Sequence, residues 1–201
     1  ADVRGAKVYI AYNRRFYSSL LEAEKYIKED DGITSLNFEF TEWGHFIEKL
    51  DNPNKDIWFF ANSTHVVDMA FFLGGFPVEL SAYAKGENSW HRPLVFAGSG
   101  ITQKNSLFSY CANWEAPGRW GVELMTKKPR LIFRPLEKLQ IQEIGSIKTA
   151  FVDIDDSLDV KYKHGLFLQT REFLEGPTCR MCTLRQQIDH AVMYKIILGE
   201  K

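Results

Sequence analysis

The apolar stretch from Trp58 to Gly75 (WFFANSTHVVDMAFFLGG) has four consecutive polar residues, Asn62-Ser63-Thr64-His65, at its centre. Its length and its closing glycine pair predict a buried helix that ends at glycine. Polar side chains inside such a helix need hydrogen-bond partners, because unpartnered burial is costly. Helical spacing places Asn62, His65 and Asp68 on one face. This face is either a set of core polar groups satisfied by neighbouring strands, or the lining of a cleft that includes His65.

A second group of chemically useful residues, Asn13-Arg14-Arg15, follows the apolar run Lys7 to Tyr12 (KVYIAY), which we predict to be a short buried strand. A helix is expected next, with Ser18 or Ser19 as its N-cap. The carboxyl end of a strand is where α/β sheets place ligands. A guanidinium group offers a planar fork of donors to phosphate or carboxylate. The two arginines are therefore either a ligand-binding pair or a solvated pair beside a strand.

The remaining motifs indicate little chemistry. Cys179-Arg180-Met181-Cys182 is a single CxxC pair, and a zinc site needs further ligands at workable spacing. A thioredoxin-like pair would follow a strand, whereas this one follows a predicted helix and Gly176-Pro177. We therefore expect unreactive thiols and no metal site. Gly98-Ser99-Gly100 lacks the helix that follows a phosphate-binding loop. No partner pattern accompanies the other histidines, which are His45, His91, His164 and His190.

Composition limits the class of protein. The 201 residues carry a formal net charge of -1, which excludes a strongly basic nucleic-acid-binding surface. No apolar run is long enough to span a bilayer. The chain starts with Ala1-Asp2 and has no cleavable signal. Because it also lacks an initiating methionine, we expect a piece of a longer polypeptide. Three cysteines, an odd number, favour reduced thiols and a cytoplasmic location.

The order of the expected elements predicts an α+β fold. One β-α-β-α run reaches Gly75, and short alternating segments joined by turns follow it. These segments predict a large, mostly antiparallel sheet with helices packed on one face. The expected strands are residues 36–41, 78–84, 94–101, 106–115, 120–125, 130–134 and 139–144. Two closing helices are expected, at about 164–175 and from the N-cap Thr183 to about Leu198.

In combination, these segments resemble a known family. KVYIAYNRRFY near the start, NSTHVVDMAFFLGG in the centre, and GLFLQTREFLEG followed by CTLRQQIDHAVMYKII at the end are similar to the C-terminal domain of Gfo/Idh/MocA oxidoreductases. The resemblance covers essentially the whole chain. It implies that residues 1–16 are the end of, or the crossover from, a nucleotide-binding Rossmann domain that is absent from this sequence. Residues 17–201 would be the C-terminal substrate-binding and oligomerisation domain.

The resemblance also implies roles for individual residues. His65 matches the family's histidine that assists proton transfer at the substrate hydroxyl, and imidazole suits that role near neutral pH. Asn13 and Arg14 match a strand-end segment that faces the cleft, and Asn62 is placed to bind substrate. Many members have Asp four residues before the histidine, where this chain has Ala61.

The implied partners are a sugar-like small molecule, the missing Rossmann domain and a second copy of the chain. NAD or NADP would be bound by the full-length parent and not by this chain alone, because the nucleotide-binding fingerprint and the catalytic lysine would lie upstream. We expect self-association through an aromatic-rich sheet face (Phe108, Tyr110, Trp114 and Trp120). The alternative is a non-catalytic binding or assembly module that keeps the fold, and Ala61 in place of Asp favours it.

Overall fold

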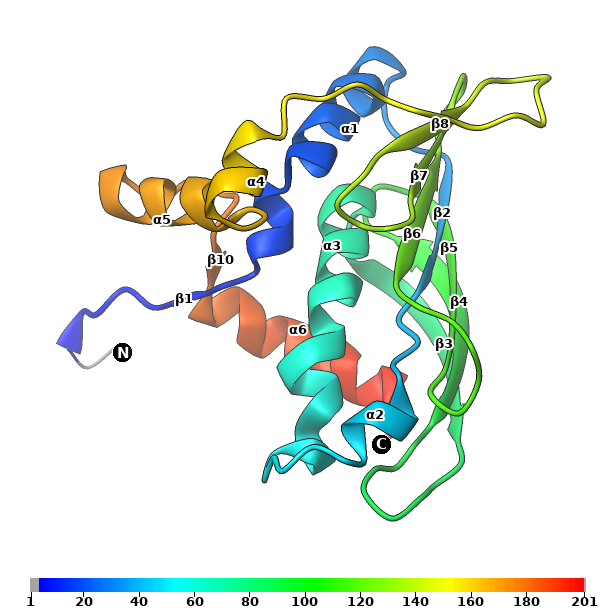
Figure 1. Cartoon of the computed structure of the whole chain (residues 1–201), viewed down its shortest axis with the longest axis vertical. Helices are drawn as coiled ribbons and strands as arrows, with labels where there is room; N and C mark the ends of the chain where they lie inside the picture. The colour runs from blue at the N-terminus through cyan, green and yellow to red at the C-terminus, as the bar shows by residue number, and fades with distance from the viewer. Residues whose placement is uncertain (1–3, 201) are drawn as a thin grey trace.

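The computed structural model describes residues 4–200, in which helices cover one face of an eight-stranded sheet (Figure 1). The strand order is β3-β4-β5-β2-β6-β7-β8-β9, and each neighbouring pair is antiparallel except β2 and β5, which are parallel. The strands are β2 (Ser35–Glu39), β3 (Pro77–Lys85), β4 (Val95–Thr102), β5 (Leu107–Asn113), β6 (Gly121–Met125), β7 (Arg130–Phe133), β8 (Gln140–Gln142) and β9 (Ala150–Phe151). The predicted α+β class with a large, mostly antiparallel sheet is confirmed.

The side chains of β5 alternate between a buried face and an exposed face of the sheet. Phe108 and Tyr110 point toward the helices and are 3% and 4% exposed, and Trp114 just after the strand is 2% exposed. The prediction that these aromatic side chains form an exposed face is therefore wrong, because their half of the alternation packs against the helices. The opposite half, which includes Leu107 at 60% exposure, lies on the outer face. No helix covers that outer face in residues 4–200 (Figure 1).

The central helix forms as predicted, with one unexpected feature. A π-helical turn, Phe59–Ser63, leads into the α-helix α3 (Thr64–Gly74), which packs against β2 and β6. Phe71 of α3 contacts Phe38 and Phe108 of the sheet, each edge to face. Gly75 follows with a φ of 89°, a conformation that favours glycine, and this ends the helix. Single π-turns inside helices are often found at functional sites.

The N-terminal segment differs from the prediction in its strand. β1 is only Tyr9–Ile10, and it is half-buried rather than buried; it pairs with β10 (Cys182–Thr183) just before the last helix. A 3-10 turn, Asn13–Phe16, then leads into α1 (Ser18–Glu29). Residues 1–3 of the segment assigned to the nucleotide-binding domain lie outside the described part.

The N-cap of α1 is Tyr17, so the prediction of a serine cap is wrong. The backbone N–H of Ser18 donates to Asp159 Oδ2 at 2.8 Å instead. A carboxylate from a distant segment thus takes the place of the local hydroxyl, which sequence spacing could not reveal.

The closing helices are α5 (Leu166–Glu175) and α6 (Leu184–Ile197), both close to their predicted bounds. Thr183 caps α6 as predicted: its hydroxyl accepts from the Gln186 backbone N–H, and the Gln186 side chain accepts from the Thr183 N–H. Two short helices were not predicted, α2 (Gly44–Ile47) and α4 (Ser157–Tyr162). Within residues 4–200 no helix combines the length and apolarity that crossing a membrane requires.

Candidate active site

His65 is the second residue of α3 and lies on the same helix face as Asn62 and Asp68. The ring is partly exposed, and its Nδ1 atom is buried without a hydrogen-bond partner. The edge of the Tyr12 ring meets it at 5.2 Å between centroids, with an interplanar angle of 89°. Burial, together with repulsion from Arg14, lowers the pKa of His65 to about 4. The imidazole is therefore neutral at pH 7.

Arg14 lies beside His65 and is held by an aromatic ring. Its guanidinium carbon is 4.4 Å from the centre of the Trp120 ring, and the whole residue is only 9% exposed. Burial lowers the pKa of Arg14, although an arginine stays charged near neutrality. Its Nε atom is buried without a hydrogen-bond partner. Arg14 thus lies close enough to His65 to affect its pKa, and the substrate-binding role of Arg14 stays a prediction.

Asn62 belongs to a network centred on Glu42, a buried carboxylate that follows β2. Glu42 Oε1 accepts from Asn62 Nδ2 at 3.0 Å and from Ser63 Oγ at 2.7 Å. Its other oxygen, Oε2, accepts from Arg119 Nη1 at 3.2 Å. Burial raises the pKa of Glu42. The polar residues of the central helix are thus partly satisfied by this carboxylate, as the first of the two sequence interpretations expects.

Three residues of this region were not singled out as site residues from the sequence. They are Glu42, Arg119 and Trp120. Arg119 stacks on the Trp120 ring at 3.9 Å and on the half-exposed Trp43 ring at 4.8 Å. Glu42 could have been identified from the sequence, because it lies just beyond the carboxyl end of a predicted strand, where sheets place ligands. The stacking of Arg119 and Trp120 beside Arg14 has no sequence signal, because a loop between strands brings them there.

Asn13 contributes to the structure around the site. Its side-chain amide donates to the carbonyl oxygen of His164 at 3.0 Å, which joins the 3-10 turn to the start of α5. Gly165 follows with a φ of 71°, and a Cβ there would lie 2.1 Å from the Asn13 carbonyl oxygen. Ala61, one helical turn before His65, is exposed and brings no carboxylate to the ring.

Deeper along the same face, Asp68 forms a buried ion pair with Arg15. Asp68 is fully buried, and its two carboxylate oxygens accept from Arg15 Nε at 2.8 Å and Nη2 at 2.6 Å. Arg15 also donates to the Arg180 carbonyl oxygen at 3.1 Å, and Arg180 donates back to the Arg15 carbonyl oxygen at 2.6 Å. These contacts join three segments: α3, the 3-10 turn and the loop before β10.

The buried, neutral state of His65 predicts a measurable effect on stability. Its pKa rises from about 4 in the folded chain to 6.5 in the unfolded chain, so the unfolded state binds more protons in that window. The free energy of unfolding therefore falls as pH decreases from 6.5 to 4, by up to ~1.4 kcal/mol per pH unit from this group. Urea titrations across this range should show a shallower pH dependence for His65→Asn. Equal slopes for the parent chain and His65→Asn contradict the prediction.

Comparison with known proteins identifies the fold. No protein-family model matches the chain, and no curated protein sequence matches it. Among solved structures, it is similar to the dehydrogenase MviM from Clostridium difficile (TM-score 0.69, 16% identity, 95% of this chain and 61% of that one). It is also similar to UDP-N-acetylglucosamine 3-dehydrogenase GnnA from Acidithiobacillus ferrooxidans (TM-score 0.67, 13% identity, 98% of this chain and 63% of that one).

A third similar structure is levoglucosan dehydrogenase in complex with NADH and L-sorbose (TM-score 0.53, 20% identity, 72% of this chain and 48% of that one). The predicted resemblance to Gfo/Idh/MocA-type oxidoreductases is thus confirmed at the level of the fold. The chain spans about half to three fifths of the length of these three proteins.

Proposed function

We propose that this chain is the C-terminal, substrate-binding part of an NAD(P)-dependent oxidoreductase of the Gfo/Idh/MocA type, acting on a sugar, nucleotide sugar or polyol. The observation that carries the proposal is the unpartnered, neutral imidazole of His65 next to the fixed guanidinium of Arg14. The likeness to sugar-acting dehydrogenases in complex with NADH supports the substrate class. In this proposal residues 17–201 form the substrate domain, and residues 1–16 lead to it from a nucleotide-binding domain.

In the proposed chemistry, His65 accepts the proton of the substrate hydroxyl. A bound nicotinamide cofactor would supply the hydride acceptor for the carbinol carbon of the alcohol. The free ring nitrogen of His65 takes the hydroxyl proton, so that a carbonyl forms and charge balances. Arg14, held against Trp120, and Asn62, held by Glu42, orient the oxygens of the substrate. The reverse reaction returns the same proton from the imidazolium to the carbonyl oxygen.

The test compares the 201-residue chain with a longer polypeptide, which is translated from the same reading frame with its upstream codons included. Calorimetry with NADH should show no tight, stoichiometric binding to the 201-residue chain. The longer polypeptide should bind NADH or NADPH and oxidise members of a sugar and polyol panel. Stoichiometric binding of NADH by the short chain, or an upstream sequence without a nucleotide-binding domain, refutes the proposal.

The second candidate is a non-catalytic binding or assembly module with the same fold. Ala61 favours it, since no carboxylate lies one turn before His65 to act with the imidazole. Under this alternative, the longer polypeptide binds a sugar-like ligand without turnover. Ligand binding with no cofactor-dependent reaction across the panel supports the module over the enzyme.

We also propose that a second copy of the chain packs against the outer face of the sheet. Within residues 4–200 no helix covers that face, and it has exposed apolar side chains, including Tyr83 and Leu107. Light scattering at tens of micromolar should report a dimer or larger assembly; a monomer contradicts this.

The three cysteines are free thiols, which suits the reducing cytoplasm that we propose as the location.

A further inference from the structure

Three residues that are far apart in the sequence meet behind the ion pair of Arg15 and Asp68. Asp68 lies on α3, Cys182 on β10 and His190 on α6. One carboxylate oxygen, the thiol sulfur and one imidazole nitrogen all lie within 4.8 Å of one another. These are the oxygen, sulfur and nitrogen donors from which protein zinc sites are made. We propose that this trio binds one zinc ion or a similar borderline divalent metal.

The donors of the trio are sheltered from solvent, and one of them lacks a hydrogen-bond partner. Asp68 is fully buried and Cys182 is 1% exposed. His190 Nδ1 is buried with no hydrogen-bond partner, and the Cys182 thiol contacts the Thr183 carbonyl oxygen at 3.6 Å and the side chain of Arg15. A buried nitrogen without a partner is unfavourable, and a metal bond removes this penalty.

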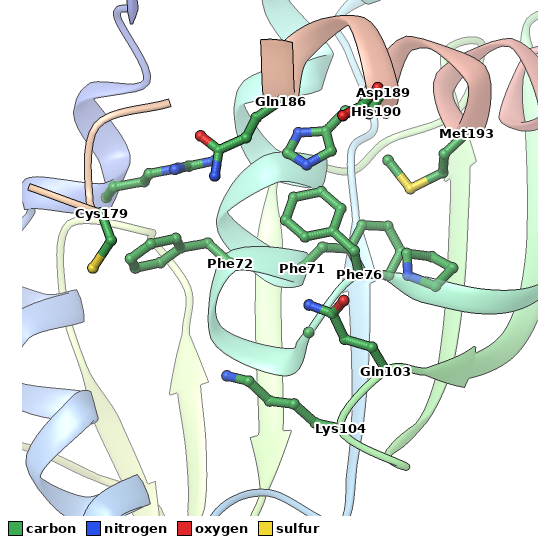
Figure 2. Close-up of a pocket in the computed structure, with 13 residues that line it drawn as sticks. Phe71, Phe72, Phe76, Gln103, Lys104, Cys179, Gln186, Asp189, His190 and Met193 are labelled. Atoms are coloured by element: carbon green, nitrogen blue, oxygen red, sulfur yellow. The ribbon is translucent and has the colours of Figure 1, made fainter. Parts of the chain in front are cut away.

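The orientation of His190 leaves its nitrogens available. Its ring stacks face to face on Phe76, with centroids 3.6 Å apart and an interplanar angle of 14° (Figure 2). Stacking uses the faces of the ring, whereas a metal binds a ring nitrogen in the plane of the ring. The stack therefore fixes the ring without competing for the lone pair, as a supporting contact around a metal ligand does.

The Arg15 guanidinium bonds both oxygens of Asp68, so its effect on a metal has to be considered. Each carboxylate oxygen has two lone pairs, and one stays free after each accepts from Arg15. Arg15 then holds the carboxylate in place, in the way that hydrogen bonds commonly orient metal-ligating carboxylates. Its positive charge lowers metal affinity, but a thiolate and a carboxylate together supply two negative charges.

The spacing requires a small contraction. Ligand atoms at tetrahedral zinc lie roughly 3.3–3.8 Å apart, given bond lengths of about 2.0–2.3 Å. The trio therefore has to close by about 1 Å from its widest allowed separation, which rotation of the Cys182 side chain about its Cα–Cβ bond can supply. Three protein ligands leave a fourth position. His190 also lines a cavity of about 500 Å³, so an open position can be reached from solvent.

The CxxC spacing is not what makes this site. Only Cys182 belongs to the trio, while Cys179 is exposed and its sulfur points away from His190 in Figure 2. The sequence therefore predicted no metal, since the other ligands come from two helices rather than from a second CxxC pair. Cys179 provides a matched control, because it is the same residue type three positions away.

The test uses Co²⁺ as a spectroscopic probe on the full 201-residue chain. We expect one Co²⁺ per chain in equilibrium dialysis, with a thiolate-to-cobalt charge-transfer absorption. Cys182→Ser should abolish the absorption, and Cys179→Ser and Cys111→Ser should keep it. Zn²⁺ at a hundred times its Kd should raise the thermal unfolding midpoint by roughly 5–10 °C, because binding joins three elements.

His190→Gln serves as the second variant, since it removes a partly exposed ligand if Cys182→Ser does not fold. It should lose the zinc-dependent rise in the unfolding midpoint while keeping the metal-free midpoint near that of the parent chain. The site is refuted if the parent shows no charge-transfer absorption, or if the absorption is lost with Cys179→Ser. These measurements do not depend on enzymatic activity, so they can fail while the proposed function holds.

Discussion

Asp68→Ala is expected to destabilise the fold by ~3–5 kcal/mol, measured as the free energy of unfolding in urea. The change leaves the Arg15 guanidinium, with a side chain only 3% exposed, without its counter-ion. Arg15 also bridges α3 to the loop before β10, so two connections weaken together. Burial disfavours the charged form of Asp68, and the hydrogen bonds from Arg15 oppose that effect.

Two comparisons separate the buried charge from the volume lost. Asp68→Asn keeps the size and one acceptor, so it should lose less stability than Asp68→Ala. The double variant Arg15→Met/Asp68→Leu removes both charges and should be more stable than Asp68→Ala, because no charge is stranded. Glu87→Ala, in an exposed pair with Arg92, should change stability by less than ~1 kcal/mol. If Asp68→Ala resembles Glu87→Ala, the ion pair is not an important stabilising contact.

His65→Asn in a longer polypeptide that includes the proposed nucleotide-binding domain is expected to reduce kcat by roughly 10²-fold or more. Asparagine keeps a polar side chain of moderate size but cannot exchange a proton near neutral pH. The effect should appear mainly in kcat, since the lost interaction develops with the transition state. Steady-state rates with the best substrate of the panel measure it, and an unchanged rate removes His65 from the mechanism.

The control for this substitution is His45→Asn, at an exposed position of α2. It should leave kcat and KM unchanged. Asn62→Ala should act differently, by raising KM more than it lowers kcat, because it removes an orienting amide and not a proton acceptor. A variant pair in which Asn62→Ala abolishes turnover and His65→Asn does not would reverse the assigned roles.

The periodicity of apolar residues predicted most of the fold. Short alternating runs separated by turn residues specified seven of the strand positions, and an apolar 18-residue stretch ending at glycine specified the central helix. The predictions failed where the interaction partners of a residue are distant from it in the sequence. The cap of α1 is supplied by Asp159, and the face of Phe108 and Tyr110 depends on where the helices pack. Alternation shows that a strand has two faces, but it does not show which one is covered.

Helical spacing was enough to predict that His65 shares a face with Asn62 and Asp68, because helical periodicity is a local property. The neighbours of these three side chains follow instead from packing between distant segments: Glu42 for Asn62, Arg14 for His65, and Arg15 for Asp68. Burial, charge neighbours and free lone pairs are properties of chain segments brought together by folding, and no pattern within one segment contains them.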